Sequence, residues 1–362
     1  MALNATAAAT GLPLFSAQTR LLVVVPHPDD ETIACGLLIQ QVREAGGAVQ
    51  VLLLTAGDNN PWPQRWLERR LRIGTGGRLR WGRRRLLEMR QALQQLGVPA
   101  QSMRTLGWPD LGVTDCLLQA DRAPLAALRA ELVQCAPSLI AIPALEDRHP
   151  DHAAAHVLVR LALAPSGDPP PVLTYLVHGA APPGGDLDIG GSSAQRASKL
   201  AALVAHRSQM ALSGGRMRRM ACRPERYRRL PSAPISPGST LPWQPPFWLQ
   251  PWLQLSVISP AGTHIWRWRA APLQRDASGR SQLPAAGIAS GQPRFVRLAL
   301  RLPTHGWRDL LQHHAAGPRG DGHHAGRRDE GGRRQHLGAT AAPSRAMTLS
   351  AFTAMACSPT LI

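Results

Sequence analysis

Cysteine and long apolar runs are scarce in this chain of 362 residues, and each scarcity excludes a class of protein. Five cysteines, without Cys-x-x-Cys spacing, argue against a disulfide framework and against a zinc site made of thiolates. The apolar run from Leu21 to Pro26 is far too short to span a bilayer. Residues 1–20 have no basic segment ahead of an apolar one, so no secretory signal is predicted. We therefore expect a cytoplasmic protein that is not integral to a membrane.

The net charge of +18 comes almost entirely from arginine, since Lys199 is the only lysine among 41 basic side chains. A chain so rich in arginine, alanine, glycine and proline first indicates a compositional bias. The alternative is attraction of an anionic partner such as nucleic acid, phospholipid or a phosphorylated sugar. The densest basic stretch runs from Arg65 to Arg90. No recognised nucleic-acid-binding module accompanies it, so nucleic acid is not the expected partner.

Apolar runs and helical spacings alternate through about residue 180. A run such as Leu21 to Val25 is typical of a strand buried on both faces of a parallel sheet. The pattern predicts an α/β fold, a Rossmann-like doubly wound and mostly parallel sheet. The expected strands are 21–25, 49–54, 138–142 and 172–177, and the expected helices are 31–45, 84–96, 124–134 and 152–163.

Composition divides the chain into four parts. Residues 1–20 are small and polar, which is typical of a flexible arm. Residues 21–230 carry the α/β pattern. Residues 231–303 contain proline-rich and alternating aromatic runs, which predict a small accessory β module. Residues 304–362 are rich in glycine, arginine and histidine without periodicity, and they indicate a disordered or aberrant tail.

The most informative motif, Pro26-His27-Pro28-Asp29-Asp30-Glu31, lies where the first strand gives way to the first helix. Ligands bind at this edge of open α/β sheets. His27 and Asp30 can converge on one point, and Asp29 lies near that point without being needed as a ligand. This pattern suits a divalent metal with an adjacent general base.

A second motif, His149-Pro150-Asp151-His152, follows the strand at 138–142 and reaches the same edge. His152 would add a third ligand and leave a fourth position for water, as catalytic zinc requires. Asp29 would then act as general base. His149, as an imidazolium, would stabilise an oxyanion or protonate a leaving amine, and Asp151 would hold its tautomer.

Each motif alone has a simpler interpretation. Asp29 or Asp30 could cap the helix that follows, and a single His-x-x-Asp is more often a cap than a metal site. Two His/Asp clusters, each directly after a buried strand of one sheet, are much harder to explain as caps. The pair therefore favours a metal centre. Zinc suits two histidines and one carboxylate, and ferrous iron would also fit them.

Together these motifs resemble the PIG-L (LmbE-like) family of zinc-dependent N-acetylglucosamine de-N-acetylases, over about residues 20–230. The softer landmarks are Thr55-Ala56-Gly57, Arg85 to Gly97, Trp108-Pro109-Asp110 and Lys199 to Gln209. The resemblance implies that His27, Asp30 and His152 bind zinc and that Asp29 is the general base. It also implies that His149, beside Asp151, stabilises the tetrahedral intermediate.

In the same family, the positions of Arg85 and Asp110 contact the sugar. The resemblance implies hydrolysis of the N-acetyl group of an N-acetylglucosamine-type glycoside or glycolipid precursor. Two alternatives stay open: hydrolysis of another amide, in a thiol conjugate or lipopeptide, and a non-enzymatic arginine-rich protein that binds nucleic acid. The arginine-rich segment Asn59 to Arg83 departs from the family pattern. The oligomeric state is not predicted.

Overall fold

A seven-stranded sheet forms the centre of the molecule, in the order β3-β2-β1-β4-β5-β7-β6. The computed structural model describes residues 15–119, 122–179, 185–231, 240–284 and 292–300, and the backbone of 308–309. Strands β1 to β5 pair in parallel, whereas β7 runs antiparallel to β5 and β6. The predicted α/β, mostly parallel fold is therefore confirmed. The strands are β1 (Arg20–Val25), β2 (Ala48–Thr55), β3 (Met103–Trp108), β4 (Leu139–Pro143), β5 (Val172–Tyr175), β6 (Leu187–Ile189) and β7 (Glu225–Arg229).

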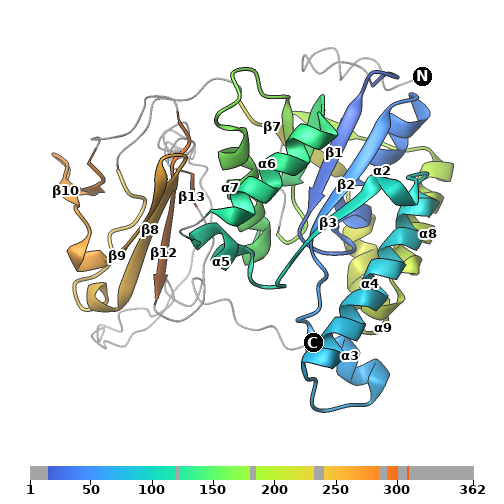
Figure 1. Cartoon of the computed structure of the whole chain (residues 1–362), viewed down its shortest axis with the longest axis horizontal. Coiled ribbons are helices and arrows are strands. Elements are labelled where there is room, and N and C mark those ends of the chain that lie inside the picture. Colours follow the sequence, from blue (N-terminus) through green and yellow to red (C-terminus); the bar gives the residue numbers. More distant parts are fainter. Residues whose placement is uncertain are drawn as a thin grey trace, which may run out of the picture.

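Helices cover both faces of this sheet, as the layers in Figure 1 show. One face packs against α2 (Asp30–Glu44), α4 (Thr75–Gln95), α8 (Ser193–Ala205) and α9 (Arg207–Ala221). The other packs against α5 (Val113–Leu118), α6 (Ala123–Cys135) and α7 (Pro150–Leu163). A short helix, α3 (Pro61–Glu68), precedes α4.

Strand β1 demonstrates why an uninterrupted apolar run was needed at the centre. Val23 and Val25 point into the core on one face, while Leu22 and Val24 point into the core on the other. Because side chains alternate along a strand, both faces can be buried only if every position is apolar. Strands β2 and β4 flank β1, so the connections that leave β1 and β4 emerge side by side at one edge.

A second, antiparallel sheet of order β13-β12-β8-β9 confirms the predicted C-terminal β module. It packs its own core, but Ile258 and Phe295 belong to the core between the central sheet and α7. Its elements are β8 (Leu253–Ser259), β9 (Gly262–Arg267), β12 (Phe295–Leu300) and β13 (Arg308–Asp309), with the pair β10 (Gln274–Arg275) and β11 (Ser281–Gln282) beside it. Short 3-10 turns, η1 (Ala100–Ser102), η2 (Gln250–Trp252) and η3 (Trp268–Ala270), complete the described elements.

Several elements differ from the sequence expectation. Strands β3, β6 and β7 were not expected, and α4 begins nine residues before the predicted start at residue 84. Of the predicted arm at 1–20, residues 1–14 lie outside the described part, Phe15 packs against the core and Arg20 already belongs to β1. The predicted tail at 304–362 also lies outside it, apart from β13. Among the described residues, the helices are all too short or too polar to cross a membrane.

Candidate metal centre

The first motif forms the turn between β1 and α2. The Asp30 carboxylate accepts the backbone N–H of His27 at 2.9 Å, which folds the turn back on itself. Both side chains are buried, with residue exposures of 7% for His27 and 1% for Asp30. Burial of a carboxylate next to an imidazole is costly unless the two interact with each other or with a cation.

The second motif forms the start of α7. His149 is the N-cap, and its Nδ1 accepts the backbone N–H of Asp151 at 3.3 Å. Pro150 occupies the first helical position, where the missing N–H costs nothing. The first turn of α7 therefore directs the fully buried His152 toward the β1–α2 turn.

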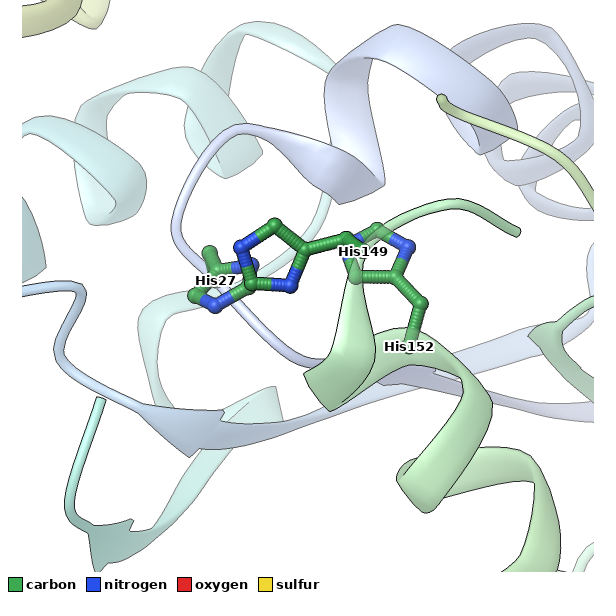
Figure 2. A group of neighbouring side chains, drawn as sticks. All are labelled: His27, His149 and His152. Carbon is green, nitrogen blue, oxygen red and sulfur yellow. The ribbon is translucent and has the colours of Figure 1, made fainter. Parts of the chain in front are cut away.

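The three predicted ligands converge at the edge where β1 and β4 end. Asp30 Oδ2 lies 3.4 Å from His27 Nδ1 and 3.2 Å from His152 Nε2. The rings of His27 and His152 are 5.4 Å apart between centroids. Figure 2 shows His149 beside these two rings, and one nitrogen from each of the three lies within 4.8 Å of the others. The two motifs, more than a hundred residues apart in the chain, thus form one cluster.

His152 gives a direct test of whether a cation fits here. Both of its ring nitrogens are buried, and among the described residues neither has a hydrogen-bond partner of acceptable geometry. Carboxylate oxygens of Asp30 and Asp147 nevertheless lie 3.2 Å away, one beside each nitrogen. Burial lowers the pKa of His152, but these two carboxylates outweigh burial and raise it to about 9. The pocket therefore favours positive charge, and its nitrogen and oxygen donors fit a divalent metal.

His27 is held from its opposite side by two carboxylates. Its Nε2 lies 3.2 Å from Asp110 Oδ1 and 3.2 Å from Asp151 Oδ2. Burial lowers the pKa of His27, but the surrounding carboxylates raise it well above the usual value. The two outer carboxylates fix Nε2 as a donor, which leaves Nδ1 facing Asp30. This is how protein carboxylates commonly orient a metal-binding histidine.

Asp151 and Asp110 are thus placed differently from the sequence expectation. Asp151 meets His149 through its backbone N–H alone, while its carboxylate contacts His27 and accepts the backbone N–H groups of Leu111 and Val113. Asp110 contacts His27 and accepts the backbone N–H of Asn59 at 2.7 Å. Asp151 differs from the expectation because the first turn of α7 points the Asp151 carboxylate across the site toward the β3–α5 connection.

Asp29 lies beside the cluster in an unusual backbone conformation, with φ 118°. Its backbone N–H donates to Glu31 Oε2 at 2.9 Å, and its carboxylate lies 3.3 Å from the Arg85 guanidinium. Arg85 is itself buried and donates to the carbonyl oxygens of Pro28 and Gly57, each at 2.6 Å. Burial raises the pKa of Asp29 to about 6, although Arg85 opposes that shift.

The surroundings of His149 lower its pKa and favour the neutral form of the ring. Burial and, after it, the neighbouring histidines His27, His152 and His178 lower the pKa of His149 to about 2. Because Nδ1 accepts the Asp151 N–H, the ring proton of the neutral form is on Nε2. In this tautomer Nε2–H can donate to an oxyanion, and the low pKa disfavours the imidazolium form that the sequence analysis expects.

Sequence reasoning did not single out Asp147 or His178, and it did not connect Glu31 with His206. Asp147 accepts the backbone N–H groups of His149, Val177 and His178, and its carboxylate also faces His152. His178 follows β5 at the same edge, so strand order could have identified it. The buried pair of Glu31 and His206, 2.9 Å apart, supports the turn at Asp29 from behind. His206 is 175 residues away in the chain, and no local signal connects it with Glu31.

Residues 22–163 match the family model described as PIG-L, GlcNAc-PI de-N-acetylase. A 1D-myo-inositol 2-acetamido-2-deoxy-alpha-D-glucopyranoside deacetylase of Mycobacterium leprae is 32% identical over 163 residues. The match covers 41% of this chain and 51% of that protein, so the chain spans about half the length of this relative. The deacetylase of the same description from Mycolicibacterium vanbaalenii is 28% identical over 242 residues, which cover 54% of this chain and 82% of that one.

Among solved structures, the N,N'-diacetylchitobiose deacetylase from Pyrococcus horikoshii is 18% identical, with a TM-score of 0.48. The alignment covers 62% of this chain and 90% of that chain. A conserved protein from Thermus thermophilus is 23% identical, with a TM-score of 0.43, and the alignment covers 63% of this chain and all of that one.

Proposed function

Because residues 22–163 match the PIG-L family model, we propose that this chain is a metal-dependent deacetylase of N-acetylglucosamine-type substrates. The observation that carries the proposal is the convergence of His27, Asp30 and His152 on one point, with Asp29 beside them. The substrate would be an N-acetylated amino sugar in a glycoside or glycolipid precursor. The products would be acetate and a free amine.

We propose that His27, Asp30 and His152 bind the metal and that the metal is zinc. Two imidazoles and one carboxylate are donors that zinc prefers, and ferrous iron would accept the same set. When bound, such a metal supplies a Lewis acid and lowers the pKa of a bound water toward about 7. Asp110, Asp151 and Asp147 orient the two histidines through their other ring nitrogens.

Asp29 is the proposed general base. Its carboxylate borders the cluster without being one of the three ligands, and the raised pKa keeps it able to accept a proton near neutral pH. His149 would donate its Nε2 proton in a hydrogen bond to the acetyl oxygen as negative charge develops there. Arg85 holds the Asp29 carboxylate and the Pro28 carbonyl together, so its first role would be to position the base.

We also propose that Arg85 and Asp110 contact the sugar, in addition to the contacts that both side chains make within the protein. Hydrolysis of another amide at the same centre is the second candidate. The arginine-rich segment after residue 59 favours this candidate, because it departs from the family pattern and would contact a substrate with a different amine component. The cytoplasmic location is still a prediction from the sequence.

The central experiment measures acetate release from N-acetylglucosaminides together with the metal content of the protein. A chelator should abolish acetate release, and added zinc should restore it. Asp29→Asn should lower kcat by about 10²–10⁴-fold, because the proton-accepting carboxylate is lost. Its zinc content should equal that of the wild type, since Asp29 is not a proposed ligand.

The matched control is Asp168→Asn, which removes an exposed carboxylate in the connection between α7 and β5. It should leave kcat within a factor of about two. A folded, zinc-loaded Asp29→Asn protein with wild-type acetate release would refute the assigned mechanism. A panel of acyl groups and amines separates the sugar substrate from the second candidate.

A further inference from the structure

The connection between α3 and α4 exposes large apolar side chains next to arginines, and the proposed chemistry uses none of them. We call residues 61–80 the α3–α4 tip. Leu71 is 87% exposed, and Trp66 is 66% exposed. The other exposed apolar residues of the tip are Trp62 (58%), Leu79 (56%) and Leu67 (39%). An exposed apolar patch of this density usually marks an interaction surface.

The same segment is strongly basic. Its exposed arginines, with those of the next helical turn, are Arg69, Arg70, Arg72, Arg78, Arg80, Arg83 and Arg84. Of these seven, only Arg80 and Arg84 form an ion pair with a carboxylate among the described residues. Glu68 is the single acidic residue of the tip. The tip therefore presents uncompensated positive charge together with apolar surface.

The tip is anchored to the body of the protein. Gln64 of α3 donates to the Gly77 carbonyl of α4 at 2.8 Å, which ties the two helices together. Trp81, immediately after the tip, is fully buried. In Figure 1 the turn between α3 and α4 lies at the lower end of the helical layer, away from the second sheet.

The tip also borders the candidate metal centre. Arg85 of α4 contacts Asp29 and lies six residues after Leu79, which corresponds to about 9 Å along a helix. The tip is therefore close along α4 to the arginine that contacts Asp29.

We propose that the α3–α4 tip docks the protein onto an anionic lipid surface. Tryptophan and leucine side chains partition into the interfacial region of a bilayer, and nearby arginines bind lipid phosphates. Neither group alone gives stable attachment, whereas the two together do. The proposal stands on the exposed side chains and charges of the tip, and it does not require the proposed deacetylase activity.

Two other occupants fit the surface less well. A second copy of the chain would bring its own uncompensated arginines against those of the first, which is electrostatically unfavourable. Nucleic acid would satisfy the arginines through its phosphates, but it offers no apolar surface to Leu71 and Leu79 along its backbone. A lipid surface accommodates both the charge and the apolar side chains.

The test is co-sedimentation of the full chain with vesicles of phosphatidylcholine alone and of phosphatidylcholine mixed with phosphatidylglycerol. We expect binding to the mixed vesicles and little binding to phosphatidylcholine. The variant Trp66→Ser with Leu71→Ser should bind the mixed vesicles at least about tenfold more weakly. The variant Arg69→Gln with Arg72→Gln should bind about 30-fold more weakly.

Matched controls use exposed residues elsewhere. Val133→Ser with Val204→Ser, on α6 and α8, and Arg196→Gln with Arg267→Gln should bind as the wild type does. Brominated lipid should quench tryptophan fluorescence on binding. Trp62→Phe with Trp66→Phe should keep the binding and lose most of the quenching, a result that a misfolded variant cannot give.

Several results would overturn the proposal. One is absence of binding to the mixed vesicles at low salt, and another is binding that the tip variants do not change. A gel shift with nucleic acid that the apolar tip variant leaves intact, together with no vesicle binding, would assign the arginines to nucleic acid. Dimerisation abolished by the same apolar variant would assign the tip to a second copy. Acetate release from a short water-soluble N-acetylglucosaminide is measured in parallel, so that failure of docking and failure of the proposed activity are told apart.

Discussion

Asp29 occupies a left-handed backbone conformation that residues other than glycine rarely adopt. Such a conformation costs on the order of 1–3 kcal/mol and persists only where its surroundings enforce it. Here the Glu31 carboxylate holds the backbone N–H of Asp29, and Arg85 holds both its carboxylate and the preceding carbonyl. The strain therefore coincides with the residue that we propose as the base.

Arg85 offers a test of this arrangement through pH dependence. The guanidinium opposes the effect of burial and keeps the pKa of Asp29 lower than burial alone would give. A general base must be ionised, so kcat/KM should fall as the pH drops through its pKa. Arg85→Met removes the positive charge, raises the pKa of Asp29 and should move the acid limb of the profile to higher pH.

Arg85→Lys retains the charge and should move the acid limb less than Arg85→Met does. Arg83→Met, which changes an exposed arginine on the same helix, should leave the profile unchanged. The pH profile of acetate release from a soluble substrate is the measurement. An unshifted acid limb in a folded Arg85→Met protein would show that Arg85 does not tune Asp29.

At the residue scale, the sequence was sufficient to predict which side chains gather but not how each is oriented. His27, Asp30 and His152 follow parallel strands, and strand ends share an edge, so their proximity could be predicted. The direction of the Asp151 carboxylate depends on where the β3–α5 connection passes, and that connection follows an unpredicted strand. Asp147 and His206 act through distant contacts that no local spacing encodes.

At the scale of elements, helix α2 is held at its middle by a carboxylate from another element. Glu225, on β7, accepts the backbone N–H groups of Leu37 at 2.7 Å and Leu38 at 3.0 Å. Its other partners are the Lys199 ammonium at 2.6 Å and the Tyr227 hydroxyl at 2.9 Å. Since α2 begins with Asp30, this contact fixes the helix that carries one of the proposed ligands.

Replacement of Glu225 should therefore destabilise the whole protein. Glu225→Gln leaves the buried Lys199 ammonium without its carboxylate and turns an amide group toward backbone donors. We expect a loss of about 3–5 kcal/mol in the free energy of unfolding. Glu131→Gln is the control, because Glu131 pairs with the more exposed Arg104 and should cost only about 1 kcal/mol or less.

Urea denaturation curves of the three proteins measure this difference. A Glu225→Gln protein within about 1 kcal/mol of the wild type would mean that α2 does not depend on the carboxylate. Lys199→Met should be costly for the complementary reason, since it leaves the Glu225 charge buried without its ammonium partner.

Whether a strand or helix could be predicted from the sequence depends on how much of it is buried. Strand β1 is buried on both faces and has an unmistakable apolar run. Strand β3 lies at the edge of the sheet with no fully buried residue, so its sequence carries no such pattern. The first part of α4 belongs to the exposed tip, where no apolar face is required and helical periodicity disappears.

At the scale of the whole molecule, the second sheet shares a core with the α/β domain. Phe295 of β12 is fully buried in the core formed by α7 and the central sheet. Its ring lies 6.4 Å from the ring of His156 between centroids, and the Arg160 guanidinium lies over it at 6.0 Å. Composition alone could predict a separate β module at 231–303, but not that one of its strands completes the packing of α7.

This shared core predicts different consequences for two substitutions in the second sheet. Phe295→Ala opens a cavity against α7 and should lower the free energy of unfolding by about 3–5 kcal/mol, whereas Leu255→Ala opens one in the core of the second sheet alone and should lower it by about 2–5 kcal/mol.

Hydrogen exchange measured by mass spectrometry separates the two variants, because locally destabilised segments exchange faster. Peptides from α7 should exchange faster in Phe295→Ala and at the wild-type rate in Leu255→Ala, while peptides from β9 should be affected in Leu255→Ala. If α7 exchanges faster than in the wild type by the same amount in both variants, the two sheets unfold as a single unit. If α7 exchanges at the wild-type rate in both variants, Phe295 does not stabilise α7. Since α7 carries His152 and begins directly after its N-cap His149, faster exchange there should be accompanied by a lower affinity for the proposed zinc ion in Phe295→Ala alone.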